Sequence, residues 1–181
     1  MKPAPPPPHA LLDTIWTEPL RDGLVVQIRP LLPQDEGHER AFLTRLPQDS
    51  LARRFVALVK PIDDAVVREL TSPDPECEAT IGAFVPAGGG EIEVGAASYA
   101  VRPDGVHCDC TVTVDPDWQK LGVGRALMKR LIAIAREHGV HRMYATTEHH
   151  AGTHALGEHL GFHARPDPED PLVTTYELVL R

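Results

Sequence analysis

The sequence lacks several features that mark other classes of protein. Only three of its 181 residues are cysteine, and two of them stand in Cys108-Asp109-Cys110, a spacing that bridges poorly on a strand. We therefore expect no disulfide framework, and a reducing cytoplasm is the expected location. No apolar run approaches the roughly 20 residues that cross a bilayer, and the N-terminus has no apolar signal-peptide segment, so no membrane partner is expected.

Basic residues are also scarce. The chain has 18 Lys and Arg against 26 Asp and Glu, which gives a formal net charge of -8 at pH 7. Neutralising the phosphates of DNA or RNA requires clustered Lys and Arg, so no nucleic-acid partner is expected. The acidity favours a cationic substrate, although the same charge also keeps a protein soluble.

The composition is otherwise that of a globular protein, with 42% hydrophobic and 24% charged residues. Residues 1–20 begin with Pro3 and Pro5–Pro8, and proline-rich segments form solvated extended chain, so this stretch is predicted to be a disordered arm. Trp16 and Leu20 are the residues within it that could dock on the domain. Residues 21–181 are long enough for one domain with a sizeable core.

The first half of this domain is predicted to contain a strand, three helices and a hairpin. Asp35 is expected to cap the first helix, whose apolar face includes Phe42. The predicted elements are a strand at 24–30, a helix after residue 35, helices at 50–55 and 63–70, and a hairpin of strands 79–85 and 91–101.

The second half begins with a strand at 108–114 that alternates strictly. Its even positions are the apolar Cys108, Cys110, Val112 and Val114, so one face is predicted to pack and the other to be polar. A helix up to residue 138, a strand at 142–147, a helix around 153–160 and a strand at 174–180 follow. This order predicts a three-layer α/β fold.

The segment Gln119-Lys-Leu-Gly-Val-Gly124 lies between a predicted strand and an amphipathic helix. Glycines let the backbone approach a ligand, and the first N–H groups of the helix remain free to donate, so the segment predicts a phosphate or pyrophosphate site. Two better-known phosphate loops do not match. Leu127 stands where the dinucleotide fingerprint needs glycine, and the chain has no Gly-Lys-Ser/Thr.

The surroundings of this segment resemble the GNAT superfamily of N-acyltransferases. The matching residues are Val112-Thr-Val-Asp-Pro-Asp-Trp-Gln119, Gly122-Val-Gly124-Arg-Ala-Leu-Met128 and Leu160-Gly-Phe162. Ile28-Arg-Pro30, Asp35 and Ser50-Leu-Ala-Arg-Arg-Phe55 further resemble the acyltransferase domain of bacterial protein-lysine acetyltransferases. The resemblance covers about residues 22–180.

The resemblance implies a mixed, mostly antiparallel sheet flanked by helices, and acetyl-CoA as co-substrate. It also implies transfer of an acetyl group to a primary amine, either a protein lysine or a small amine, with a homodimer as one option. The pantetheine arm would pair with the backbone of one strand, and the pyrophosphate would sit on the loop after it. The implied residues are Val112, Thr113 and Val114 for the arm, and Gln119, Lys120, Leu121, Gly122, Val123, Gly124 and Arg125 for the loop.

Three residues are candidates for proton transfer. Asp109 stands where the lysine-acetyltransferase subgroup carries a catalytic glutamate, and is the expected base. Many family members place a tyrosine four residues before the Gly-Phe pair to protonate the thiolate, but this chain has Gly157 there. His154 or His150 could substitute. The absence of that tyrosine leaves a non-catalytic acyl-CoA-binding module as the alternative, and no metal site is expected because His-Glu-x-x-His is absent.

Overall fold

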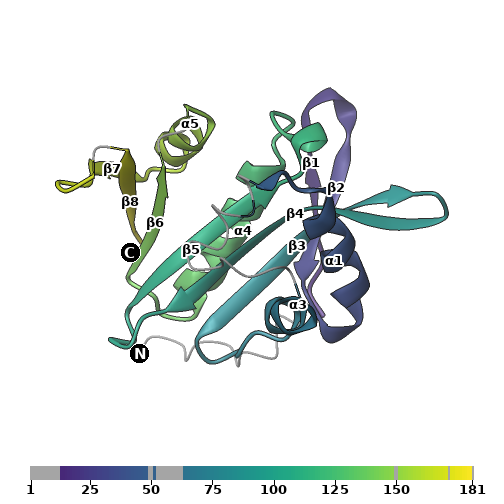
Figure 1. Ribbon diagram of the computed structural model, residues 1–181, viewed down its shortest axis with the longest axis horizontal. Helices are drawn as coiled ribbons and strands as arrows, with labels where there is room; N and C mark the ends of the chain where they lie inside the picture. Colours follow the sequence, from purple (N-terminus) through teal and green to yellow (C-terminus); the bar gives the residue numbers. More distant parts are fainter. Residues whose placement is uncertain (1–12, 49–50, 52–62, 149–150, 171, 181) are drawn as a thin grey trace.

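The protein folds around one eight-stranded sheet with the strand order β1-β2-β3-β4-β5-β6-β8-β7 (Figure 1). The computed structural model describes residues 13–48, 51, 63–148, 151–170 and 172–180. All neighbouring strands are antiparallel except β5 and β6, which are parallel. The strands are β1 (Trp16–Pro19), β2 (Val25–Pro30), β3 (Glu78–Ala87), β4 (Gly90–Val101), β5 (His107–Val114), β6 (Arg142–Glu148), β7 (His163–Pro166) and β8 (Val173–Val179).

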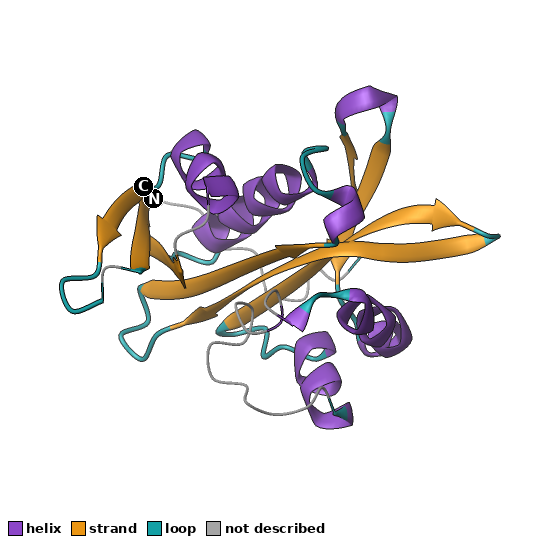
Figure 2. Ribbon diagram, turned by 45° about the horizontal axis from the view of Figure 1, so that its top comes forward, coloured by secondary structure: helices purple, strands orange, loops and turns teal. Residues whose placement is uncertain are grey.

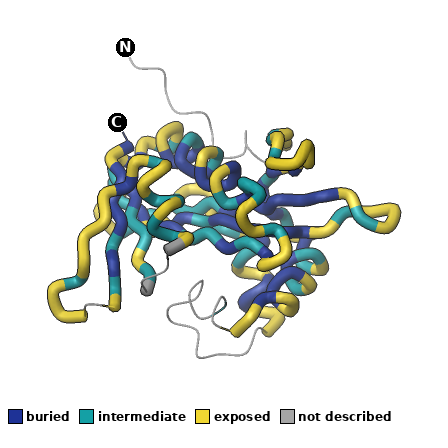
Figure 3. Tube along the Cα trace, turned by 90° about the horizontal axis from the view of Figure 1, so that it is seen from above, coloured by how far each residue is buried: buried dark blue, intermediate teal, exposed yellow. Residues whose placement is uncertain are grey.

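Helices cover both faces of this sheet, which confirms the predicted three layers (Figure 2). The α1 face carries α1 (Glu36–Arg45) and α3 (Asp64–Thr71), and its smaller core joins Phe42, Leu43 and Val67 to Ala96 of β4. The α4 face carries α4 (Val123–Glu137) and α5 (Ala151–His159) over the larger core. Burial is concentrated in the strands and in the helix sides that meet them, while the tip of the β3–β4 hairpin is exposed (Figure 3).

Most predicted elements are confirmed within a few residues. The hairpin forms as β3 and β4, and α3 begins where Asp63 accepts a hydrogen bond from the Val66 amide at 3.0 Å. No helix in the described part of the chain is long and apolar enough to span a bilayer. The helix predicted at 50–55 lies, apart from Leu51, outside the described residues.

The predicted capping role of Asp35 is wrong. Its side chain gives no cap to α1. Instead it accepts two hydrogen bonds from Arg29, at 2.8 and 2.9 Å, and one from the Leu32 amide at 2.9 Å. Burial alone would raise the pKa of Asp35, but these bonds hold the pKa below its ordinary value. The Asp35 carboxylate therefore neutralises the largely buried Arg29 guanidinium of β2 instead of capping α1.

Two short strands were not predicted. β1 lies inside the stretch expected to be a disordered arm, residues 1–20, so that expectation is wrong for residues 16–19. The physical reason is that Trp16 and Leu20 pack against the larger core and Glu18 forms an ion pair with Arg130 of α4. Residues 1–12 lie outside the described part. The other unpredicted strand, β7, is a four-residue edge strand.

Candidate functional site

β5 and β6 separate halfway along their length. They pair only at the three positions from His107↔Arg142 to Asp109↔Tyr144, although β5 continues to Val114 and β6 to residue 148. On its other edge β5 stays paired with β4 as far as Val114. We call the opening between residues 110–114 and 145–148 the splay; Figure 1 shows the two strands diverging there.

The splay exposes one edge of the β5 backbone. The Arg102 amide donates to the His107 carbonyl, and the Asp115 amide donates to the Val94 carbonyl, so odd-numbered residues of β5 turn their backbone groups toward β4. Even-numbered residues, including Cys110 and Val112, therefore turn theirs toward the splay. An extended chain lying in the splay could pair with this edge as an added strand.

This register bears on the three residues expected to hold a pantetheine arm. Val112 and Val114 present backbone groups to the splay, whereas those of Thr113 face β4. The carbonyl of Val114 already accepts a hydrogen bond from the Gln119 side chain at 3.1 Å. Thr113 is also the more buried side chain, at 9% exposed, so the predicted alternation of packed and polar positions does not extend to this end of β5. On the α1 face Thr113 pairs with Ala96, which belongs to the smaller core under α1, and Arg45 of α1 bonds to Asp115 just beyond β5.

The loop from Gln119 to Gly124 turns the chain sharply into α4. Lys120 and Gly122 have positive φ angles of 63° and 107°. The first helical bond runs from the Ala126 amide to the Gly122 carbonyl at 3.0 Å, and Gly122 offers no capping side chain. Within the ranges that the structure describes, the N–H groups of Val123, Gly124 and Arg125 have no hydrogen-bond acceptor. These donors and the helix dipole suit an anion.

Basic side chains surround this loop. Lys120 and Arg125 are exposed, and neither forms an ion pair with any other residue that the structure places. The Arg21 amide donates to the Leu121 carbonyl at 2.9 Å, which fixes the turn after β1 against the loop. The exposed Arg21 is therefore a third cation beside the loop, and sequence reasoning missed it because its approach depends on β1.

Two glycines set how closely the walls of this region approach. A Cβ atom on Gly95 of β4 would lie 3.1 Å from Leu127 and 3.2 Å from Val123, so the start of α4 packs directly on the sheet. A Cβ on Gly124 would lie 3.5 Å from Val114 and 3.6 Å from Leu156. The start of α4, the end of β5 and helix α5 therefore meet around the top of the splay.

Asp109 lies on the α1 face at the point where β5 and β6 stop pairing. Its carboxylate accepts two hydrogen bonds from Arg102, at 2.8 and 2.6 Å, and remains exposed. The Arg102 guanidinium in turn stacks on the Tyr144 ring, 4.4 Å from its centroid. A base at Asp109 would thus be held by a cation and open to solvent.

His154 lies on α5, over the α4 face, and so on the opposite side of the sheet from Asp109. Its Nδ1 atom is 3.4 Å from the Tyr176 hydroxyl, and its Nε2 atom is 3.3 Å from a carboxylate oxygen of Glu158. His150 lies outside the described residues. The structure therefore does not bring Asp109 and His154 together on one face but sets them on either side of the splay.

The cysteines of β5 are packed. Cys108 and Cys110 are both buried, and burial raises the pKa of the Cys108 thiol to about 12, so it stays neutral. Among the residues that the structure describes, no group of three His, Cys, Asp or Glu side chains is placed to hold a metal ion.

Two buried carboxylates on the α1 face were not anticipated. Glu39 and Glu93 are 0% and 1% exposed. Beside them Arg45 donates to the Glu93 carbonyl at 2.6 Å and to Asp115 at 3.1 Å, which ties α1 to the end of β5. The sequence could have indicated that Glu39 is buried, because Glu39 precedes the buried Phe42 by three residues and so shares the core-facing side of the helix.

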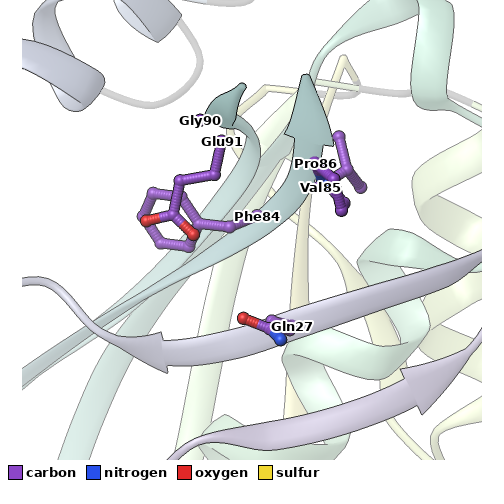
Figure 4. A pocket seen from close by; sticks show the side chains of 6 residues that line it. All are labelled: Gln27, Phe84, Val85, Pro86, Gly90 and Glu91. Atoms are coloured by element: carbon purple, nitrogen blue, oxygen red, sulfur yellow. The ribbon is translucent and has the colours of Figure 1, made fainter. Parts of the chain in front are cut away.

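Two hollows lie elsewhere on the sheet. One, of about 300 Å³, is lined by residues of β2 and the β3–β4 hairpin, including Phe84 and Glu91 (Figure 4). The other, of about 450 Å³, surrounds Arg29, whose charge is balanced by Asp35 and Glu91. No residue of β5, α4 or α5 lines either hollow, so they are separate from the splay.

Comparisons with known proteins show which family this sequence matches. The sequence profile described as the acetyltransferase (GNAT) family matches residues 51–162. A Pseudomonas aeruginosa protein named acetyltransferase PA5475 is 34% identical over 168 residues, which cover 91% of this chain and 89% of that protein.

Solved structures share the fold. The GNAT domain of S. lividans PAT superposes with a TM-score of 0.78 at 20% identity, covering 91% of this chain and 96% of that one. The structure of yncA, a putative acetyltransferase from Salmonella typhimurium with its cofactor acetyl-CoA, gives 0.68 at 24% identity, covering 86% of this chain and 94% of that one.

Proposed function

Because the chain belongs to the acetyltransferase (GNAT) family, whose members use acetyl-CoA, we propose that it transfers an acetyl group from acetyl-CoA to a primary amine. The observation that carries the proposal is the combination of a free strand edge on β5 with free N–H donors at the start of α4. One extended ligand with an anionic end can use both at once.

In this proposal the pyrophosphate of acetyl-CoA binds the backbone N–H groups between Lys120 and Arg125. The pantetheine arm then runs down the splay and pairs with Val112, so that the thioester comes to rest near residue 110. Each N–H contact contributes on the order of 1 kcal/mol, and useful affinity needs several of them together with the basic side chains.

The acceptor amine approaches from the α1 face. An alkylamine with a pKa near 10.4 is neutral only about once in 2,500 molecules at pH 7, which costs roughly 4.6 kcal/mol, so a base is required. Asp109 lies on the α1 face at the closed end of the splay, next to the proposed position of the thioester, and is therefore our proposed base. Its ion pair with Arg102 and its exposure favour proton transfer through a water molecule rather than directly.

We propose a protein lysine as the acceptor. The resemblance of Ile28-Arg-Pro30 and Asp35 to the lysine-acetyltransferase subgroup supports this choice, as does the net charge of -8, which attracts cationic segments. The three cysteines are free thiols, which suits the reducing cytoplasm that we propose as its location.

The proposal is tested by calorimetric titration with acetyl-CoA, followed by thiol release in the presence of lysine peptides and small amines. We expect acetyl-CoA to bind and thiol release to depend on the amine. Binding without any amine-dependent release would instead favour the non-catalytic acyl-CoA-binding module, and no binding at millimolar acetyl-CoA would contradict both.

A further inference from the structure

A tyrosine from β8 fills the space beneath α5 that a side chain at position 157 would occupy. A Cβ atom on Gly157 would lie 3.0 Å from Cδ1 and 3.3 Å from Cε1 of Tyr176. Such distances are tighter than ordinary contacts, so glycine at this position is what allows the ring to pack under the helix. The Tyr176 ring is 2% exposed and belongs to the larger core.

Strand register places Tyr176 level with the closed end of the splay. Tyr176 pairs with Ala145 of β6, and Ala145 is the residue directly after the last β5–β6 pair, Asp109↔Tyr144. The strand order sets β6 between β8 and the splay, so at this level the small residue Ala145 lies between Tyr176 and the splay. α5 lies above these strands in Figure 1.

The hydroxyl of Tyr176 begins a chain of polar groups that reaches solvent. It lies 3.4 Å from Nδ1 of His154, and Nε2 of His154 lies 3.3 Å from the exposed carboxylate of Glu158. The His154 side chain is 43% exposed, so this imidazole is in contact with water. Burial raises the pKa of Tyr176 above its ordinary value, and the phenol therefore stays protonated at neutral pH.

We propose, resting on the acetyl-transfer function above, that Tyr176 protonates the departing thiolate of coenzyme A and that protonated His154 replaces the proton. The amine nitrogen forms its bond to the acetyl carbon, and the C–S bond breaks with its electron pair on sulfur. The Tyr176 O–H proton moves to sulfur while the Nδ1–H proton of His154 moves to the phenol oxygen. Glu158 stabilises the imidazolium form of His154, which forms again when the imidazole takes a proton from solvent. The proton lost by the amine leaves on the opposite face of the sheet.

The expected effect is moderate because a thiol near pKa 8.5 is already a fair leaving group. Tyr176→Phe should lower kcat about 10- to 100-fold, at or below the lower end of typical general-acid effects, while the Kd of acetyl-CoA changes little. Tyr99→Phe is the matched control. Tyr99 is also a buried tyrosine whose hydroxyl contacts a histidine, His138, at 2.6 Å, but at the far end of α4. It should keep the wild-type kcat.

A swap of positions separates the chemistry from packing. In a Tyr176→Ala background the space beneath α5 is empty, and a helical side chain introduced at 157 leans toward the helix N-terminus and His154. Gly157→Tyr in that background should restore most of the lost kcat, whereas Gly157→Phe, with the same ring but no hydroxyl, should not. His154→Gln gives a second, conservative variant, which should lower kcat without displacing the ring.

The outcomes are distinct. A wild-type kcat for Tyr176→Phe, or equal rescue by Gly157→Phe and Gly157→Tyr, overturns the proton transfer alone while acetyl transfer stands. If the wild-type protein itself binds acetyl-CoA but releases no thiol with any amine, the acetyl-transfer function fails and the proton transfer fails with it. Unfolding temperatures of all variants, measured alongside, identify any loss of kcat that comes from misfolding.

Discussion

At the scale of the residue, Asp109, the proposed base, is hydrogen-bonded to the Arg102 guanidinium. Both of its oxygens accept hydrogen bonds from Arg102, yet the pair is exposed, and exposed pairs contribute only about 0.2–1 kcal/mol to stability. Opening the pair to release one oxygen is therefore inexpensive. The Arg102 guanidinium can keep its stacking contact with the Tyr144 ring when the Asp109 carboxylate turns away.

We predict that Asp109→Asn lowers kcat at neutral pH and leaves the Kd of acetyl-CoA nearly unchanged, as measured by steady-state kinetics and calorimetry. An amide cannot accept the amine proton. Arg102→Gln is the matched control, since it breaks the same ion pair but keeps the carboxylate, and should retain or raise kcat. An equal loss in both variants would assign the ion pair a structural role and remove Asp109 from the mechanism.

A second residue, His138, links stability to pH. Burial lowers the pKa of this histidine, whose Nδ1 atom meets the Tyr99 hydroxyl and whose Nε2 atom is buried without a described partner. Below pH 6.5 the unfolded chain therefore binds a proton that the folded protein resists. Stability supplied by the neutral ring is complete above that pH and declines as the pH falls.

We predict that the free energy of unfolding falls more steeply between pH 7.5 and pH 5 in the wild type than in His138→Gln. One titrating group contributes at most about 1.4 kcal/mol per pH unit, which urea unfolding at several pH values resolves. Subtracting the two curves removes the titrations common to both proteins. Parallel curves would show that His138 is protonated as readily in the folded state as in the unfolded chain.

At the scale of the element, the position of α4 decides where the N–H groups proposed to bind the pyrophosphate lie. Gly95 is the contact that matters, because a Cβ there would also lie 3.1 Å from the Thr113 carbonyl, which cannot move without disturbing β5. A methyl group at this point pushes the start of the helix away from the sheet. The loop and its N–H groups move with it.

Gly95→Ala should therefore destabilise the protein by about 1–3 kcal/mol and also weaken acetyl-CoA binding at a temperature where the variant is folded. Thermal unfolding and calorimetry measure the two effects. Gly37→Ala on α1 is the control, because a Cβ there meets nothing within 4 Å; better helix propensity should stabilise it by up to about 1 kcal/mol with binding unchanged. Wild-type affinity in folded Gly95→Ala would argue against this account of the loop.

The helices, strands and loops differ in how far the sequence alone predicts them. α4, the loop before it and the β3–β4 hairpin carry local signals of periodicity, glycine and turn residues, and all three were predicted. β1 and β7 have only four residues each and exist because longer strands beside them offer an edge. The splay has no signature within β5 or β6 alone, because it depends on where two strands distant in sequence stop pairing.

At the scale of the whole molecule, the protein is negatively charged while its proposed acetyl-CoA site is surrounded by positive side chains. The chain carries a net charge of -8, while Arg21, Lys120 and Arg125 stand exposed around the loop. Acetyl-CoA is a polyanion, so the net negative charge of the protein repels it at long range. The cations around the loop attract it only at short range. A lysine peptide is attracted by the same overall charge.

The two substrates should therefore respond to salt in opposite directions. Raising the ionic strength from about 0.01 M to about 0.1 M shortens the Debye length from about 30 Å to about 10 Å, which screens the net charge more than the close contacts at the loop. We predict that the KM of a lysine-rich peptide rises severalfold over this range, while the KM of acetyl-CoA stays level or falls. Steady-state kinetics with one substrate saturating measures each.

A peptide with one lysine flanked by glutamates separates this field effect from any salt effect on the enzyme itself. It presents the same amine with the opposite net charge, so its KM should fall where that of the lysine-rich peptide rises. If both peptides respond alike, the net charge of -8 serves solubility and does not select the acceptor. In that case selection must come from side chains on the α1 face near Asp109, where short-range contacts outlast screening by salt.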